Sequence, residues 1–261
     1  MFTFDIITLI PKMFEVLTTD GVLSRAINKG EVNVKTWNPR DYVSDIHQTI
    51  DDKPFGGGPG MVMMIEPVLK VLEAIKASHQ KKKINAVKTI FLSPKGKTLT
   101  HKKVVELSKI KNLILISGRY EGIDQRIIDN FVDEEISIGD YVTSGGELPA
   151  MILVDAVSRL LPRVLNNVES YEGDSFYNGF LDYNHYTRPA NYDDLKVPEV
   201  LLSGDHKKIA VWRKKNALLE TFKKRPDLIN DQELTIEQSR LLQEVLSEQE
   251  QDLKKKEKKM K

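Results

Sequence analysis

The sequence has no cysteine among its 261 residues, which excludes a disulfide framework, thiol catalysis and cysteine-based zinc or iron–sulfur sites. Its five histidines lack the paired spacing of a zinc site. Apolar runs reach at most five residues, whereas a membrane-spanning helix needs roughly 18. No basic stretch precedes an apolar one at the start, so no secretory signal is visible. These absences predict a globular protein with no membrane contact and a cytoplasmic location.

The body of the chain also lacks an excess of positive charge. The formal net charge is +1, but residues 254–261 alone carry six Lys and one Glu, and the rest of the chain holds 33 basic and 37 acidic groups. A slightly acidic body excludes a strongly basic binder of nucleic acid. Any contact with a polyanion must therefore come from a local patch. Residues 205–225, with eight Lys or Arg against two acidic residues, are the candidate.

The first 165 residues alternate between strand-like and helix-like patterns. Short β-rich runs occur at 3–10, 32–37, 89–92, 113–117 and 135–138, and helix-compatible stretches occur near 12–29, 66–77, 98–109, 123–131 and 147–161. This alternation is typical of a mostly parallel sheet with helices on both faces. The sequence therefore predicts an α/β domain over 1–165.

The composition changes after Pro162. Residues 166–194 lose regular periodicity and gather Asn, Gly, Asp and Tyr, which is typical of an interdomain linker. Two apolar stripes at helical spacing follow, the first with Ile209, Trp212, Leu219 and Phe222 and the second with Leu234, Leu241, Leu242, Val245 and Leu246. We expect a small helical domain over 195–250 and a disordered Lys-rich tail over 251–261.

Loops that follow the strands of a parallel sheet are the first place to look for a ligand site. Three of them, at 93–96, 117–122 and 139–147, combine glycine with polar side chains. Glycine lets a backbone approach a ligand closely and present its main-chain donors and acceptors. Such a surface suits a planar heterocycle, and the sequence contains neither the P-loop nor the dinucleotide fingerprint after a strand. A glycine that only closes a turn is the simpler interpretation of any single loop, but three loops at equivalent strand ends favour a site.

A further glycine-rich segment reads Phe-Gly-Gly-Gly-Pro-Gly at 55–60. This composition cannot continue a strand or a helix, so it predicts a turn or a mobile loop. The loop could wrap a ligand or lie along a phosphate. A flexible connector ahead of the helix near Pro67 is an equally good interpretation.

Five motifs occur in order along the chain. They are Gly-Gly-Gly-Pro-Gly-Met at 56–61, Gly-Arg-Tyr-Glu-Gly at 118–122, Ser-Ile-Gly-Asp-Tyr at 137–141, Ser-Gly-Gly-Glu-Leu-Pro-Ala at 144–150 and His-Tyr-Thr-Arg-Pro at 185–189. In these motifs the chain resembles the TrmD family of bacterial tRNA (guanine-N1)-methyltransferases, which belongs to the SPOUT superfamily. The resemblance runs from Phe4 to the region of Phe222. Thr143 departs from it, since an aliphatic residue is expected there, and the Lys-rich end has no counterpart.

The resemblance implies a sheet domain with a deep trefoil knot whose loops bind S-adenosylmethionine in a bent shape. It also implies a homodimer with shared active sites and, as substrate, guanosine 37 of tRNA when the preceding base is also G. The residues it assigns to the cofactor are Phe91, Leu92, Ser93, Pro94, Gly118, Tyr120, Glu121, Ser137, Ile138, Gly139, Asp140, Tyr141, Val142, Thr143, Gly145 and Gly146.

Methylation of guanine at N1 has a definite chemical requirement. N1 carries a proton and becomes nucleophilic once that proton leaves, while charge spreads onto O6. A general base near N1 and a cation near O6 are therefore needed. The resemblance assigns the base to Asp174 and the cation to Arg159. From the residues alone, Asp174 could cap a turn and Arg159 could form a surface ion pair with Asp155, four residues earlier on one helix.

Glu121 is implied as a carboxylate of the cofactor and substrate site, where it would assist a magnesium ion. As an alternative, it is a solvated carboxylate at the start of the following helix. The sequence itself assigns no set of metal ligands.

The linker is rich in aromatic residues, with seven of the chain's 19 between 171 and 192. Such rings among polar groups suit stacking on an extruded RNA base, and they would equally fasten the linker to the sheet domain. The basic arc, which we define as Arg213, Lys214, Lys224 and Arg225, suits phosphate contacts or simply a solvated helix face. The residues assigned to the substrate are Gly56, Gly57, Gly58, Ser175, His185, Arg188, Trp212 and Arg213.

These observations predict an enzyme that methylates N1 of guanosine 37 in tRNA with S-adenosylmethionine. Two alternatives remain open from the sequence. One is a knotted methyltransferase that acts at another RNA position, and the other is an RNA-binding protein that keeps the fold and transfers nothing.

Overall fold

The structure is a computed structural model, and it describes residues 1–84, 86–165, 171, 173–230 and 233–259, the last eleven of these as backbone only. The chain divides into two compact units, Met1–Val168 and Glu169–Lys261, and each unit has its own hydrophobic core. The linker expected over 166–194 begins on residues 166–170, which lie outside the described ones.

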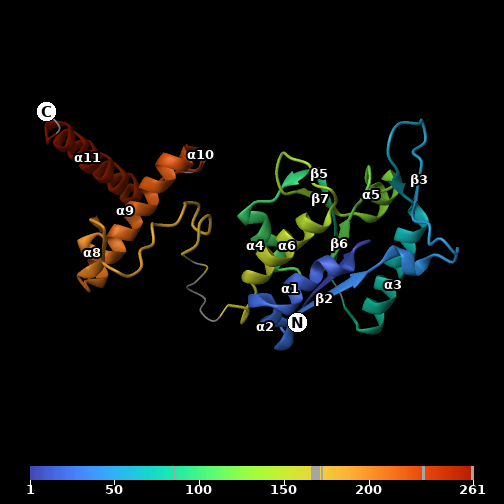
Figure 1. Ribbon diagram of the computed structural model, residues 1–261. Coiled ribbons are helices and arrows are strands. Elements are labelled where there is room, and N and C mark those ends of the chain that lie inside the picture. Colours follow the sequence, from blue (N-terminus) through green and yellow to red (C-terminus); the bar gives the residue numbers. More distant parts are fainter. Residues whose placement is uncertain (85, 166–170, 172, 231–232, 260–261) are drawn as a thin grey trace. The chain divides into compact units, whose positions relative to one another are not determined.

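A five-stranded parallel sheet in the order β2-β1-β6-β5-β7 forms the centre of the first unit (Figure 1). Its strands are β1 (Phe2–Ile7), β2 (Val32–Trp37), β5 (Val87–Thr98), β6 (Asn112–Ser117) and β7 (Glu134–Ser137). All residues of β1 and β6 are buried, because these strands lie inside the sheet and are covered on both faces. The predicted α/β fold with a parallel sheet is confirmed.

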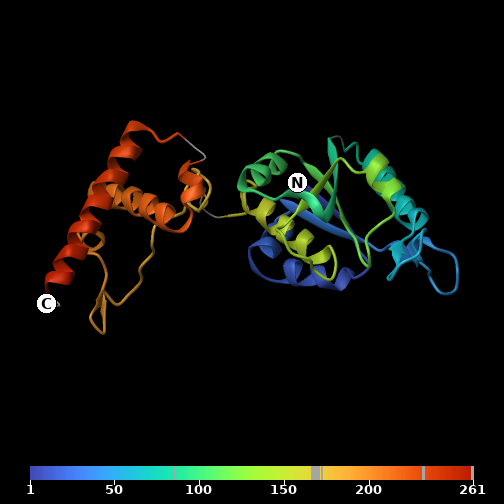
Figure 2. The same cartoon turned by 90° about the horizontal axis from the view of Figure 1, so that it is seen from above.

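Helices cover both faces of this sheet (Figures 1 and 2). Alternate residues of β1 enter two different cores: Phe4 and Ile6 join one, and Ile7 joins the other. The first core is closed by α1 (Glu15–Thr19), α2 (Gly21–Asn28), α4 (His101–Ser108) and α6 (Glu147–Arg159), and the second by α3 (Ile65–Lys81) and α5 (Gln125–Phe131). Short 3-10 turns, η1 (Pro11–Phe14) and η2 (Pro39–Tyr42), and a two-stranded ribbon of β3 (Asp51–Asp52) and β4 (Val62–Met63) complete the unit.

The helix predictions differ from the structure at several points. The helix predicted near 66–77 runs four residues further, to Lys81. The stretch 12–29 is not one helix, because Asp20 is extended and Gly21 has φ of +83°, which separates α1 from α2. The helix expected from residue 98 begins at His101, because β5 continues to Thr98 and Thr100 caps the helix by accepting a hydrogen bond from the Lys103 backbone N–H.

The segment 93–96, expected as a loop, lies within β5. Both Leu92 and Lys97 pair with Ile136 of β7, so the four residues between them bulge out of the ladder. Gly96 passes directly over the backbone of Glu135, where a Cβ would have no room. The bulge therefore keeps strand pairing on both sides and still exposes Pro94 and Lys95, while Ser93 is buried.

The second unit is mainly helical. Its elements are β8 (Asn191–Tyr192), β9 (Leu195–Lys196), α8 (Glu199–Leu202), α9 (His206–Lys224), α10 (Pro226–Asn230) and α11 (Ile236–Lys259). The core packs Leu218 and Leu219 of α9 against Leu241, Leu242 and Val245 of α11, so the second apolar stripe is buried as its spacing predicts.

Two details of this unit differ from the sequence analysis. Phe222 of the first stripe is 43% exposed, and Leu218, which the stripe omitted, is buried in its place. The end of the chain, expected to be a disordered tail, continues α11 as far as Lys259, and residues 260–261 lie outside the described ones. Glu, Gln and Lys favour helix, and no Gly or Pro interrupts this stretch.

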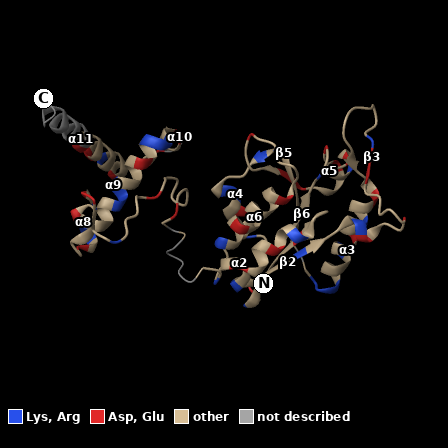
Figure 3. Cartoon of the chain, in the orientation of Figure 1, with Lys and Arg blue, Asp and Glu red and all other residues tan. Residues whose placement is uncertain are grey.

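Within the described ranges, no helix combines the length and the apolar character that crossing a bilayer requires. Figure 3 shows Lys and Arg beside Asp and Glu along both units. Several of these neighbours are ion pairs, including those of Lys215 with Glu244 and Glu248, which join α9 to α11 at 3.1 and 2.9 Å.

Candidate functional site

A cavity of about 250 Å³ lies at the carboxyl edge of the sheet. It is lined by the bulge of β5, by the loop after β6 and by the loop after β7, which is the position expected for a ligand site in a parallel sheet. The walls include backbone from glycine-containing loops and the rings of Phe91, Tyr120 and Tyr141. The three loops singled out in the sequence therefore meet at one site.

All but two of the residues assigned to the cofactor line this cavity. They are Phe91, Leu92, Ser93, Pro94, Gly118, Tyr120, Glu121, Ser137, Ile138, Tyr141, Val142, Thr143, Gly145 and Gly146. Gly139 and Asp140 do not line it. They form a tight turn before Tyr141, whose N–H donates to the Gly139 carbonyl at 2.9 Å.

Close contacts explain two of the glycines. A Cβ at Gly146 would lie 2.7 Å from the Ser117 Cα, and one at Gly118 would lie 2.9 Å from the ring of Phe91. Heavy atoms at these distances overlap, so any other residue would push the loops apart. The Gly146 N–H donates to the Gly118 carbonyl at 2.8 Å, which holds the two loops together at the cavity.

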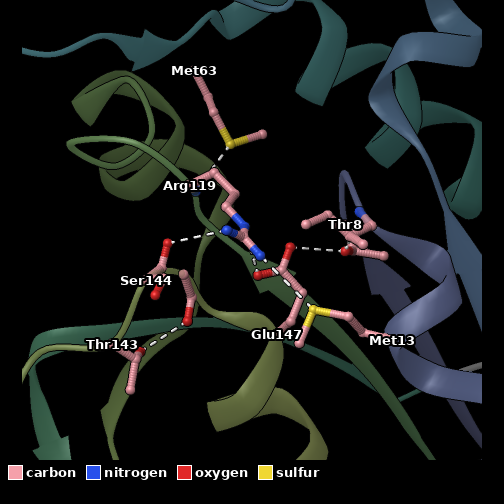
Figure 4. A network of polar contacts seen from close by, with 9 residues as sticks. Thr8, Met13, Met63, Arg119, Thr143, Ser144 and Glu147 are labelled. Atoms are coloured by element: carbon pink, nitrogen blue, oxygen red, sulfur yellow. Dashed lines mark hydrogen bonds and ion pairs between the residues drawn. The ribbon is translucent and has the colours of Figure 1, made fainter. Parts of the chain in front are cut away.

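An ion pair with a buried carboxylate fastens the same two loops to each other (Figure 4). Arg119 Nε lies 3.0 Å from Oε2 of Glu147, whose side chain is 1% exposed, and Thr8 Oγ1 donates to Glu147 Oε1 at 3.0 Å. Arg119 Nη1 also donates to the Ser144 carbonyl at 3.3 Å. The network joins β1, the loop after β6 and the start of α6, so it sets the relative positions of two cavity walls.

The glycine-rich segment approaches the cavity only at its last residue. Gly60 touches the carboxylate of Glu121, and the Glu121 N–H donates to the Met61 carbonyl at 2.9 Å. Gly56, Gly57 and Gly58, assigned to the substrate, are exposed and do not line the cavity.

The pKa of Tyr120, which lines the cavity, is raised above its ordinary value. Burial is the larger cause, and the nearby Asp51 carboxylate is the second.

A second cavity, of about 550 Å³, lies within the second unit. Its walls include Asp174 and Arg213, two assigned residues that are 39 positions apart in the sequence, together with Tyr183, whose ring lies 4.8 Å from the Arg213 guanidinium. Arg159 is exposed at the end of α6 in the first unit. The two residues assigned to catalysis therefore belong to different units of the chain.

Two further substrate assignments are brought together by a residue that the sequence analysis did not single out. The Ser175 hydroxyl donates to Asp182 Oδ1, and His185 Nε2 lies 3.2 Å from Asp182 Oδ2. The hydrogen bond from Ser175 holds the pKa of Asp182 below its ordinary value; burial opposes this effect, and the contact with His185 adds to it.

The remaining substrate assignments lie apart from Asp174. Trp212 packs against Tyr186, with ring centroids 6.3 Å apart, and Arg188 lines a separate recess beside Tyr186. The basic arc is largely neutralised, because Lys214, Lys224 and Arg225 pair with Glu237, Glu220 and Asp227 respectively. Arg213 and Lys214 both line the second cavity, and Arg213 lies over the Tyr183 ring there.

The sequence analysis missed three charged residues of the first cavity region. Arg119 and Glu147 fall inside the motifs but were assigned no role, since nothing local shows that residues 28 positions apart form a buried pair. Glu135 lines the cavity from β7. Its sequence neighbour Glu134 faces the other side of the strand. The alternation of side chains along a strand is the one sequence signal that could have shown that the two glutamates lie on opposite faces.

The parallel sheet and its cavity define a class, the α/β proteins that bind a small ligand at the carboxyl ends of parallel strands. Comparison with known families identifies the family within this class. The family described as tRNA (Guanine-1)-methyltransferase TrmD matches residues 2–231. This covers most of the chain and both units, and the chain belongs to this family.

Individual relatives agree with the family. The chain is 53% identical over 245 residues to a tRNA (guanine-N(1)-)-methyltransferase of Pseudoalteromonas atlantica, which covers 94% of this chain and 91% of the relative. It is 53% identical over 252 residues to the protein of that name from Chromobacterium violaceum, covering 97% and 98%. A Pseudomonas putida protein of the same name is 54% identical over 244 residues, covering 94% and 96%.

Proposed function

We propose that this protein transfers a methyl group from S-adenosylmethionine to N1 of guanosine 37 in tRNA when the preceding base is G. Membership of the tRNA (Guanine-1)-methyltransferase family over residues 2–231 carries the proposal. The cavity supports it, because fourteen of the residues assigned to the cofactor meet there. Its place of action is then the cytoplasm, where tRNA is processed.

The first cavity fits the nucleoside end of S-adenosylmethionine. Its backbone-rich walls offer hydrogen bonds to a heterocycle, and Phe91 and Ile123 offer apolar contact. Gly118 and Gly146 keep side chains out of the space between the loops. The cavity is smaller than the ~300–1,000 Å³ of most ligand sites, so part of the cofactor would extend past the rim.

Asp174 is proposed as the general base and Arg159 as the cation that stabilises charge on O6. S-adenosylmethionine supplies a methyl group activated by the positive sulfur. As N1 loses its proton to Asp174, the N1–C bond forms and the C–S bond breaks, which leaves S-adenosylhomocysteine and protonated Asp174. Within its unit, Asp174 lines a cavity with Tyr183 and Arg213, so a carboxylate, an aromatic ring and a cation lie along one cavity that could receive a nucleobase.

The proposal extends to topology and assembly. Family membership favours a trefoil knot in the first unit and a homodimer in which one subunit's Asp174 serves the other's cofactor site. A magnesium ion near Glu121 is part of the same proposal; the described residues contain no group of three or more His, Asp or Glu side chains that could hold a metal. We assign no step to a metal.

Methyl transfer can be tested with labelled S-adenosylmethionine and two tRNA transcripts that differ only at the base before guanosine 37. We expect incorporation into the transcript with G at that position, and mapping should place the label at N1 of guanosine 37. Label at another nucleotide would favour the other knotted methyltransferases, and no incorporation with tRNA bound would favour an RNA-binding protein.

Substitution of Asp174 tests the base separately. Asp174→Asn should lower the rate ~10²–10⁴-fold and leave tRNA binding unchanged, because an amide cannot accept the N1 proton. Asp193→Asn, in an exposed turn of the same unit, is the matched control and should transfer at the wild-type rate. A rate for Asp174→Asn equal to that of the control would remove Asp174 as the base.

A further inference from the structure

Glu135 presents a buried carboxylate oxygen at the first cavity. Its Oε2 atom is buried and has no hydrogen-bond partner among the described residues, and Glu135 is one of the residues that line the cavity. A buried polar atom without a partner is uncommon in folded proteins, because burial removes the water that would otherwise bind it. An unused acceptor at a ligand cavity indicates a ligand that donates to it.

Strand pairing shows which way Glu135 faces. Glu135 stands opposite Phe91 in the parallel ladder of β5 and β7, and paired residues of neighbouring strands project to the same face of a sheet. Phe91 belongs to the core on the α3 and α5 side and lines the cavity. The side chain of Glu135 is therefore on the cavity side of β7.

Glu134, the preceding residue, provides an internal comparison. It projects to the opposite face and is fully engaged there: Oε2 lies 2.6 Å from Lys88 Nζ and Oε1 lies 2.9 Å from Lys103 Nζ. Two consecutive glutamates of one strand thus have different surroundings. One contributes ion pairs to the fold, and the other keeps an acceptor atom without a partner beside the cavity.

We propose that Glu135 binds S-adenosylmethionine. Its Oε2 atom accepts a hydrogen bond from an N–H or O–H group of that ligand. The inference rests on the proposed function. S-adenosylmethionine offers such donors at both ends, namely the adenine amino group and ribose hydroxyls of the nucleoside and the ammonium group of the amino acid. A carboxylate also suits a ligand that carries a positive sulfur, since opposite charges attract strongly where water is excluded.

The two glutamates give a paired experiment. Glu135→Met should weaken binding of S-adenosylmethionine tenfold or more in calorimetry, because a hydrogen bond to a charged group is lost. The same substitution should leave the melting temperature of the ligand-free protein equal or higher, since it removes an unpartnered buried acceptor. Glu134→Met should do the reverse: the ligand-free protein should melt at a lower temperature, and the dissociation constant should stay within about twofold.

A second ligand identifies the donor group. 5′-Methylthioadenosine keeps the adenine and ribose and lacks the ammonium group. An equal loss of affinity for both ligands in Glu135→Met supports a contact with the nucleoside, and a loss confined to S-adenosylmethionine supports a contact with the ammonium group or attraction to the positive sulfur, both of which 5′-methylthioadenosine lacks.

The inference and the proposed function fail in different ways. If the wild-type protein binds S-adenosylmethionine and Glu135→Met binds it equally well, the role of Glu135 is overturned and the proposed function stands. A wild-type protein that does not bind S-adenosylmethionine, with or without tRNA, overturns both.

Discussion

Arg119 Nε lies 3.0 Å from Oε2 of Glu147, and this ion pair joins two loops that line the first cavity. The Glu147 carboxylate is 1% exposed and also accepts from Thr8 Oγ1, so it connects β1 to both loops. A Cβ at Gly145 would lie 2.6 Å from Arg119 Nε and 2.6 Å from Glu147 Oε2. The glycine at 145 is therefore required by this ion pair, before any ligand is considered.

Glu147→Gln tests the ion pair. Loss of the buried carboxylate leaves the Arg119 guanidinium without its charged partner, so we expect the free energy of unfolding to fall by ~2–4 kcal/mol. The loops should also hold S-adenosylmethionine less tightly, which calorimetry can measure. Glu66→Gln, which removes an exposed pair with Lys70, is the control and should cost less than about 1 kcal/mol. Equal losses of unfolding free energy for the two substitutions would show that the Glu147 ion pair stabilises the protein no more than an exposed pair does.

A second buried polar network stabilises the first unit. Asp5 accepts from Trp37 Nε1 and lies against His79 Nε2, both at 2.7 Å, and Asp5 is 3% exposed. Asp5→Ala should lower the free energy of unfolding in urea by ~2–4 kcal/mol, because the buried His79 ring and the partly buried Trp37 ring both lose their hydrogen-bond partner. Trp37→Phe removes a single donor and should cost less. An unchanged urea midpoint for Asp5→Ala would contradict this account.

Acid should weaken the second unit through Asp182. The hydrogen bond from Ser175 lowers the pKa of Asp182 in the folded protein, so the stabilisation is complete above the ordinary pKa and is lost as the pH falls through the lower, folded value. Asp182→Asn should therefore lower the melting temperature most at pH 6–7, and its difference from wild type should narrow below about pH 4. Ser175→Ala should show the same trend more weakly. A difference that is constant between pH 3 and 7 would exclude ionised Asp182 as the cause.

Shared active sites can be tested by mixing subunits. If Arg159 and Asp174 of one site come from different subunits, co-expressed Arg159→Ala and Asp174→Ala chains should recover about one quarter of the wild-type activity, because half of the dimers are mixed and each has one intact site. Each variant alone should be inactive. Inactivity of the mixture, with mixed dimers demonstrated by tags, would place both residues in one chain's site.

The sequence by itself determined the architecture of the first unit. Alternating strand and helix patterns predicted a parallel sheet with helices on both faces, and glycine-bearing loops after the strands predicted where a cavity forms. These features are local, since periodicity and turn chemistry act over a few residues. The motifs likewise indicated the family that the comparison then showed.

The tertiary structure decided which polar groups meet. Arg119 pairs with Glu147 across 28 positions and Asp5 meets His79 across 74, and neither distance leaves a pattern in the sequence. The contrast between Glu134 and Glu135 has the same origin. Two identical neighbours acquire different surroundings because successive side chains of a strand project to opposite faces, and only the packed sheet shows that one face holds two lysines and the other a cavity.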